Sequence, residues 1–441
     1  MPRVSKRARA ISCLSNILNY RMKARAIRIY DDDDDSLEEI KDLATVICLS
    51  EIRKRRYLQR PSKYRKGPAQ ERFKTDLNAD QIEGENSSSG CERPWRTDDE
   101  FLQKYRVTRR SFKYILDLIS DHPIFDSKTK AMAPPSYQLM VFLKYVGTEG
   151  SGASNSNQRG TFGVGYGTAD LYRARVTKAI RSLYPEYVSW PDVEERRQIS
   201  KAIETQYGFP HCVGIADGTL FPLAFEPQTE DAPDYSGRKY GYSLTTMVIC
   251  DHKRRVRHYL GGYPGSAHDN RVFKATKIFQ KPNEHFEPMQ YIIGDSAFEN
   301  QPFMVSAFKK PKGEPIPRKH EQFNEHLAKL RIISEHCIGM LKGRFPWLRS
   351  IRLLITEDQN SLKKILRLLK ATVVLHNILV EVGELEKNDW IDHDDFSDID
   401  DADRASVLSA SDVLNQGIHP GAPKDERRTR LMYYFEESTY F

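Results

Sequence analysis

The stretch Val213-Gly-Ile-Ala-Asp217-Gly-Thr219 decides how the rest of the chain is interpreted. A short apolar run ends on an aspartate, and a glycine follows at once. This order predicts a buried strand that delivers a carboxylate to the edge of a sheet, where the glycine lets the chain turn and lets a ligand approach. Asp-Gly is also the commonest turn dipeptide, so the motif alone more often marks an ordinary strand-ending turn.

Two further carboxylates downstream change the interpretation of Asp217. Asp295 closes Tyr291-Ile-Ile-Gly-Asp-Ser and repeats the order of strand, small residue and aspartate, and Glu335 borders the apolar stripe of a predicted helix over 322–344. A lone helical glutamate is usually solvated or salt-bridged. Together, two strand-end aspartates and a helical glutamate are hard oxygen ligands that suit a pair of Mg²⁺ ions and in-line phosphoryl displacement.

Composition limits the class of protein. The 441 residues allow two domains, or one large domain with extensions, and the hydrophobic fraction of 39% fits a soluble globular protein. The net charge of +7 is compatible with a polyanionic partner, and the cations concentrate in residues 1–30 and 51–75. Six cysteines without a CxxC pair predict reduced thiols in an intracellular protein. No apolar run approaches the ~18 residues of a membrane span.

Residues 95–205 have a helical pattern. We expect a helix that starts at a cap on Thr97 or Asp98, a second over 107–119 with Thr108 as its cap, a buried helix over 137–145 and, after an irregular glycine-rich loop, a helix over 168–183. The last helix carries Arg173, Arg175, Lys178 and Arg181, which we expect on its surface. Helix, loop and basic helix is a helix-turn-helix-like order typical of DNA binding, and a plain helical bundle gives the same pattern.

Residues 206–382 change to an α/β pattern. Short β-rich runs at 213–216, 243–250, 256–260 and 291–293 alternate with predicted helices at 268–279, 322–344 and 360–382, which indicates a mixed β-sheet flanked by helices. The flanking regions have biased compositions. Residues 1–94 predict a basic and acidic, largely disordered arm with a linker, and residues 383–441 predict an acidic flexible tail that ends in a short helix at 425–435.

Several ordered motifs resemble those of a known family. They are Gly214-Ile-Ala-Asp-Gly-Thr219, Tyr235-Ser-Gly-Arg-Lys-Tyr-Gly-Tyr-Ser243, Gly262-Tyr-Pro-Gly-Ser-Ala-His-Asp-Asn270, Ile293-Gly-Asp-Ser-Ala-Phe298, Phe323-Asn324, Arg331 to Lys342 and Leu375-His-Asn377. In this order they resemble the PIF/Harbinger transposases and the host nucleases derived from them, which are members of the DDE superfamily. The resemblance covers about residues 210–380 and implies an RNase H-like core.

The resemblance implies roles for individual residues. It makes Asp217, Asp295 and Glu335 a catalytic triad that holds divalent metal, Mg²⁺ with Mn²⁺ as a substitute, and Asp269 a further metal-holding acid; a helix cap is the alternative role for Asp269. Arg238, Lys239 and Arg344 lie near the triad in sequence, so they are candidates for contacts to DNA phosphates, or for pairing with nearby acids. We expect His376 and Asn377 to form a buried hydrogen-bonded element.

The first functional hypothesis is therefore a Mg²⁺-dependent DNA endonuclease and strand transferase of the Harbinger type. It further implies DNA as the substrate and a separate Myb-like accessory protein that helps with DNA binding and nuclear entry. It also implies residence in the nucleus, with shuttling to the cytoplasm, and is compatible with a homo-oligomer. The second hypothesis is a domesticated, non-catalytic DNA-binding or recruitment protein, which the long unmatched arm motivates. A metal-dependent phosphatase or RNase with the same core is a third reading, supported by the carboxylates alone.

Overall fold

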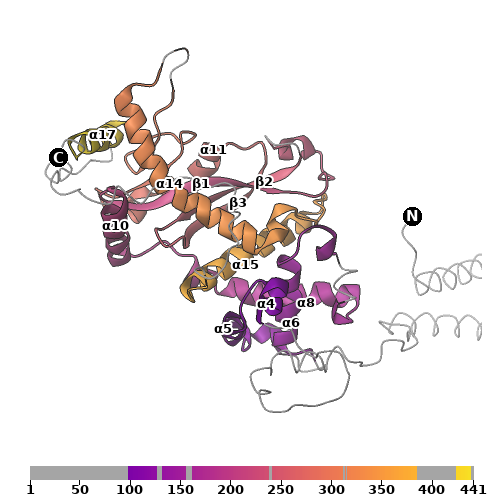
Figure 1. Cartoon of the computed structure of the whole chain (residues 1–441). Helices are drawn as coiled ribbons and strands as arrows, with labels where there is room; N and C mark the ends of the chain where they lie inside the picture. The colour runs from indigo at the N-terminus through magenta and orange to yellow at the C-terminus, as the bar shows by residue number, and fades with distance from the viewer. Residues whose placement is uncertain are drawn as a thin grey trace, which may run out of the picture. The chain divides into compact units, whose positions relative to one another are not determined.

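The computed structural model describes residues 98–126, 132–154, 161–237, 241–310, 313, 315–384 and 424–438 (Figure 1). The arm predicted over 1–94 and most of the tail predicted over 383–441 lie outside these residues. The described part is a mixed α/β structure with one five-stranded sheet, so the predicted α/β class is confirmed. None of the described helices combines the length and the apolar character that crossing a bilayer requires.

The first part of the described chain is helical. It contains α4 (Asp98–Tyr105), α5 (Arg109–Ile119), α6 (Pro135–Val146), α8 (Tyr166–Ser182), α9 (Tyr184–Tyr187) and α10 (Val193–Tyr207), with 3-10 turns at Pro123–Phe125 and Gly150–Ala153. The predicted cap of α5 is confirmed, because the Thr108 side chain accepts a hydrogen bond from the Ser111 amide at 3.2 Å. The helix-turn-helix interpretation of this region stays a prediction.

One basic residue of α8 is not on the surface as predicted. Arg173 is only 7% exposed; its guanidinium pairs with Asp170 and lies 4.2 Å from the centre of the Tyr145 ring. The aliphatic stem and planar head of arginine suit such a buried position, where the charge has a partner and a ring face. The predicted basic surface of α8 therefore consists of Arg175, Lys178 and Arg181.

The sheet has the order β3-β2-β1-β4-β5. Its strands are β1 (Cys212–Pro222), β2 (Ser243–Cys250), β3 (Val256–Pro264), β4 (Tyr291–Gly294) and β5 (Met304–Ser306). The first three strands form an antiparallel meander, while β4 pairs parallel with β1 and β5 pairs parallel with β4. This mixed sheet is consistent with an RNase H-like fold. The short β5 was not predicted.

β1 is longer than the sequence predicts. It continues through Asp217 and Gly218 to Pro222, and Asp217 and Gly218 pair with Val248 and Met247 of β2. The predicted turn after Asp217 is therefore wrong. The antiparallel pairing with β2 supplies partners for the backbone of this stretch, which outweighs the turn preference of Asp-Gly.

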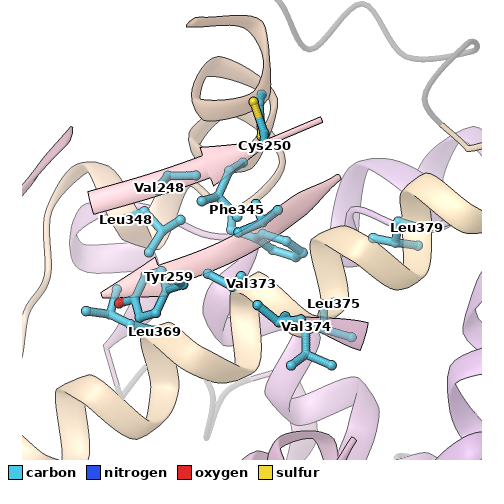
Figure 2. Close-up of a cluster of buried hydrophobic side chains, with 14 of the residues drawn as sticks. Val248, Cys250, Tyr259, Phe345, Leu348, Leu369, Val373, Val374, Leu375 and Leu379 are labelled. Carbon is cyan, nitrogen blue, oxygen red and sulfur yellow. The ribbon is translucent and has the colours of Figure 1, made fainter. Parts of the chain in front are cut away.

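Both faces of the sheet are covered. Along β2, Val248 and Cys250 face one buried cluster, and Met247 and Ile249 face the other, as the two-residue period of a strand requires. Figure 2 shows the first cluster, in which Val248 and Tyr259 of the strands lie with Leu369 and Val373 of α15 (Gln359–Glu381). The second cluster holds the side chains of the helices that follow β3.

The region after β3 differs from the prediction. In place of one helix over 268–279 there are α11 (Asp269–Lys274) and α12 (Lys277–Gln280), followed by α13 (Pro282–His285). Thr276 separates the first two, because its side chain accepts a hydrogen bond from the Phe279 amide and caps α12. The residue that precedes α11 is His268, so Asp269 opens that helix without being its cap.

Two long helices and a terminal helix complete the fold. α14 (Arg318–Arg344) packs on β1, and α15 packs on both β3 and α8 (Figure 1). A 3-10 turn at Pro346–Arg349 joins them, and another lies at Ala232–Tyr235. The predicted helix near the C-terminus is present as α17 (Glu426–Ser438), where the Phe435 ring packs at an angle against Phe209 and Phe323.

Candidate active site

The parallel pairing of β1 and β4 places Asp217 and Asp295 at equivalent positions along the two neighbouring strands. Ile215 of β1 is the partner of Ile293 of β4, and each aspartate lies two residues further along its strand direction. Because side chains two residues apart point to the same face, Asp217 and Asp295 extend toward the face that carries Ile215 and Ile293. Asp295 lies just beyond the end of β4, and its Oδ1 accepts a hydrogen bond from the Ala297 amide at 2.8 Å.

α14 brings Glu335 to the same face of the sheet. Its neighbour Ser334 is 1% exposed, and the Ser334 Oγ lies 3.5 Å from Asp217 Oδ2. Glu335 has a side chain that is 43% exposed and accepts a hydrogen bond from Arg331 at 3.5 Å, one helical turn earlier. The helix thus buries its Ser334 side against β1 and leaves Glu335 at the solvent border, as the apolar stripe predicts.

Electrostatics connect these groups. The pKa of Asp217 is raised to about 6, with burial as the largest cause. The Arg331 guanidinium and the Gly218 amide lower this pKa, while repulsion by Asp295 and Glu335 raises it. Three carboxylates that repel one another share this site, with one guanidinium as partial compensation. The structure therefore brings together the three predicted acids Asp217, Asp295 and Glu335.

Asp269 approaches β1 from the other face. A Cβ atom added to Gly218 would lie 2.0 Å from Asp269 Oδ1, so the carboxylate occupies the space where a side chain at 218 would be. Successive residues of a strand point to opposite faces, and Gly218 follows Asp217 directly. Asp269 is thus not brought together with the other three acids. Glycine is required at 218 for this close approach.

The donor set fits a hard divalent cation. Carboxylate oxygens are the ligands that Mg²⁺ and Mn²⁺ prefer, and a cation would relieve the repulsion that raises the pKa of Asp217. As positioned in the described part of the chain, no three acidic, histidine or cysteine side chains enclose a site small enough to coordinate an ion. The three acids form an open cluster, with Glu335 at its exposed side.

A basic cleft opens beside Asp295. It has a volume of about 540 Å³, and its lining comes from α11, from the turn after Asp295 and from the segment after β5: His268, Asn270, Arg271, Lys274, Ala297 and Lys309. Lys274 is paired with Glu299 at 2.7 Å, whereas Arg271 and Lys309 are exposed. A cationic cleft of this kind can hold the phosphates of a nucleic-acid strand. The sequence does not reveal this cleft, since its residues come together only in the fold.

Of the three cations predicted to contact DNA, the structure describes one. Arg238 and Lys239 lie outside the described residues. Arg344 is 3% exposed and is ion-paired with Glu384 at 3.6 Å, and its burial lowers the pKa of the guanidinium. A side chain in this position has no access to a phosphate backbone, so Arg344 supports the attachment of the segment after α15 instead.

His376 and Asn377 form a buried hydrogen-bonded element, as predicted. Asn377 is fully buried; its Nδ2 donates to the carbonyls of Val256 and Tyr187, both at 2.7 Å, and its Oδ1 accepts from the Val256 amide at 2.8 Å. His376 Nε2 lies 2.9 Å from the Arg254 carbonyl. Hydrogen bonding to Cys250 lowers the pKa of Cys337, which also contacts His376, but Cys337 is 1% exposed and no substrate reaches it.

The fold and the acidic cluster together are consistent with a nuclease of the DDE class. Residues 216–377 match the family described as DDE superfamily endonuclease. All four predicted acids lie inside the matched residues.

Individual relatives agree with this assignment. The chain is 24% identical over 309 residues to "Protein ALP1-like" from Arabidopsis thaliana, which covers 66% of this chain and 72% of the relative. It is 22% identical over 288 residues to "Putative nuclease HARBI1" from Mus musculus, and this match covers 65% of this chain and 79% of the relative. A stretch of 132 residues is 26% identical to "Probable transposase for insertion sequence element IS702" from Microchaete diplosiphon, over 29% and 45% of the two chains. No solved structure matches the chain. The resemblance to Harbinger-derived nucleases is confirmed.

Proposed function

We propose that the protein is a divalent-metal-dependent DNA endonuclease and strand transferase of the PIF/Harbinger type. The observation that carries this proposal is the convergence of Asp217, Asp295 and Glu335, from two strands and a helix, on one face of the sheet. The family match over residues 216–377 supports nuclease chemistry, and the relatives named as a nuclease and a transposase support DNA as the substrate.

Each acid has a distinct position in this mechanism. Asp217 and Asp295 are held by paired strands, so they would form the rigid part of a site for Mg²⁺ or Mn²⁺, and Glu335 would approach from α14. Bound divalent cations would lower the pKa of the attacking water or hydroxyl and stabilise the departing oxygen. Arg331 keeps its guanidinium beside Glu335 and offsets part of the negative charge of the cluster.

The basic cleft supplies the position of the substrate. Arg271 and Lys309 can bind phosphates of the strand that continues past the scissile bond, because both are exposed at a cleft that reaches Ala297, two residues from Asp295. The cations of the cleft would hold the flanking phosphates, and the acids would face the reacting phosphate. The strand would thereby be oriented for the reaction.

The decisive experiment measures metal-dependent nicking of DNA that carries the terminal sequences flanking the gene, beside random DNA. Asp217→Asn, Asp295→Asn and Glu335→Gln should each reduce the nicking rate by about a hundredfold or more, since metal-assisted stabilisation of the transition state is worth several kcal/mol. Glu325→Gln is the matched control, an exposed glutamate on the same helix, and should cut like the parent protein. Equal cutting by all five proteins overturns the proposal.

The remaining parts of the proposal concern the cell. We infer nuclear residence, a Myb-like accessory protein and strand transfer by the freed 3′-hydroxyl, all from the Harbinger resemblance. Fractionation and pull-downs from nuclei test the first two, and recovery of joined product in a strand-transfer assay tests the third. A host phenotype that Asp217→Asn still rescues would favour the alternative of a non-catalytic recruitment protein.

A further inference from the structure

A strongly basic surface lies where α8 and α15 meet. On α8, Arg175, Lys178 and Arg181 follow one another at intervals of three residues, so they share one helical face. On α15, Lys363, Arg367 and Lys370 recur at i, i+4 and i+7 and share another. We refer to these six residues as the basic ridge.

Contacts between the helices show that the two halves are adjacent. Lys364 of α15 pairs with Asp170 of α8 at 3.5 Å. Arg181 has a lowered pKa, first through burial and then through the positive charge of Arg367. Lys370 lies 5.2 Å from the centre of the ring of Tyr184, which begins α9 directly after α8. Since α8 and α15 pack against each other (Figure 1), the two halves of the ridge are adjacent.

The orientation of α15 keeps the charges outward. Ile365 and Leu369 are fully buried and Leu366 contacts Gly262 of β3, while Lys363, Arg367 and Lys370 are exposed. Between Gln359 and Val380 the helix has no acidic residue, and neither has α8 from Leu171 to Ser182. Asp170 of α8 pairs with Arg173 of its own helix and with Lys364 of α15.

Charges of one sign at such density repel one another and leave a positive potential. The exposed positions from 363 to 370 extend about 10 Å along the helix axis. Duplex DNA presents one negative charge per about 1.7 Å of its axis, so several phosphates can face the ridge at once. We propose that the basic ridge binds the phosphate backbone of duplex DNA, as a composite surface of the helical region and the nuclease domain. This inference rests on the proposed function for its choice of DNA.

The composite surface differs from the helix-turn-helix prediction. That prediction assigns DNA binding to α8 within the helical region alone, whereas here half of the cations belong to α15, which also packs on β3 of the sheet. A duplex on the ridge would thus be fixed relative to the sheet that carries Asp217 and Asp295.

The test measures binding of a fluorescent duplex of about 30 base pairs by anisotropy, with full-length protein that carries Asp217→Asn and with EDTA present. Lys178→Ala/Arg181→Ala changes the α8 half, and Arg367→Ala/Lys370→Ala changes the α15 half. Lys201→Ala/Lys277→Ala removes two exposed lysines from α10 and α12 and is the charge-matched control. The ridge and control substitutions replace exposed or half-buried side chains, and thermal melts verify that the folds are equal.

Each ridge variant should raise Kd by about tenfold or more at 0.1 M salt and reduce the slope of log K against log salt by about two, while the control should change Kd less than about threefold. Loss of binding in one ridge variant alone refutes the composite surface. Ridge variants that bind like the control, or a parent protein that prefers single-stranded RNA or anionic vesicles, refute the DNA assignment. Because binding is measured without metal, failure of the nicking assay does not affect this result, and failure here leaves the nicking assay open.

Discussion

Asp217 is the residue at which the electrostatic cost of the site is concentrated. Its pKa is raised to about 6 by burial and then by the charges of Asp295 and Glu335, whereas an aspartate in an unfolded chain has a pKa of about 3.9. Between these two values the folded protein binds a proton that the unfolded chain does not. Stability is therefore highest below about pH 4 for this group and falls as the pH rises through 6, by about 2–3 kcal/mol.

Replacement of the charge should remove this penalty. We expect Asp217→Asn to unfold with a free energy about 1–3 kcal/mol higher than the parent at pH 7, and with little difference near pH 4. Urea unfolding across pH 4–8, without divalent metal, measures both. Glu325→Gln, which removes an exposed charge from α14, should follow the parent at every pH. A destabilised Asp217→Asn at pH 7 would contradict the repulsion among the three acids.

At the scale of elements, α15 is the connection between the helical region and the sheet. Its Asn377 satisfies both backbone groups of Val256 at the start of β3 and also binds the Tyr187 carbonyl after α8. No apolar side chain can do this, because two donors and one acceptor are needed in a fully buried position. α15 thus contributes to the fold through Asn377 and contributes half of the basic ridge through its opposite face.

Asn377→Ala should therefore be costly. Three buried backbone groups lose their partner, and each unsatisfied group costs about 1–3 kcal/mol, so we expect a loss of at least about 3 kcal/mol in the free energy of unfolding. Asn360→Ala, at the exposed start of the same helix, should cost less than about 1 kcal/mol. Chemical denaturation of the two variants decides this. Similar losses in both variants would mean that the buried hydrogen bonds of Asn377 add no particular stability to the fold.

At the scale of the whole molecule, the sequence was enough to predict the fold class and the acidic residues of the site, but not the position of every residue in the fold. The apolar runs that end on Asp217 and Asp295, and the apolar stripe beside Glu335, sufficed to predict the α/β class and the three converging acids. The length of β1 could not be foreseen, because local Asp-Gly preference indicates a turn and only the pairing with β2 reverses it.

Other features depend on which face a residue occupies. The family resemblance made Asp269 a candidate fourth ligand, yet it fills the space beside Gly218 on the opposite face. This position follows only once β1 is known to continue. Arg173 and Arg344 illustrate the same limit: exposed and buried arginines look alike in sequence, and burial is decided by partners such as Asp170 and Glu384 that tertiary packing supplies.

The acidic cluster exists only in the folded molecule, since its members come from β1, the end of β4 and α14. A cation that binds all three therefore binds the folded state and not the unfolded chain. We expect Mg²⁺ at ten times its dissociation constant to stabilise the full-length protein by about 1.4 kcal/mol, seen as a rise in Tm over an EDTA sample. The rise should be larger at pH 7.5 than at pH 5, because Asp217, with a pKa of about 6, must lose its proton to accept the ion.

Matched variants separate this effect from general salt stabilisation. Asp217→Asn and Glu335→Gln should lose most of the rise in Tm, whereas Glu325→Gln should keep it, and K⁺ at equal ionic strength should not reproduce it. The ligand role of the three acids is a proposal from their chemistry and convergence. A Tm that rises equally in all four proteins would mean that Mg²⁺ binds elsewhere. A rise confined to proteins with the intact cluster would place the cation among three residues that the chain brings together only by folding.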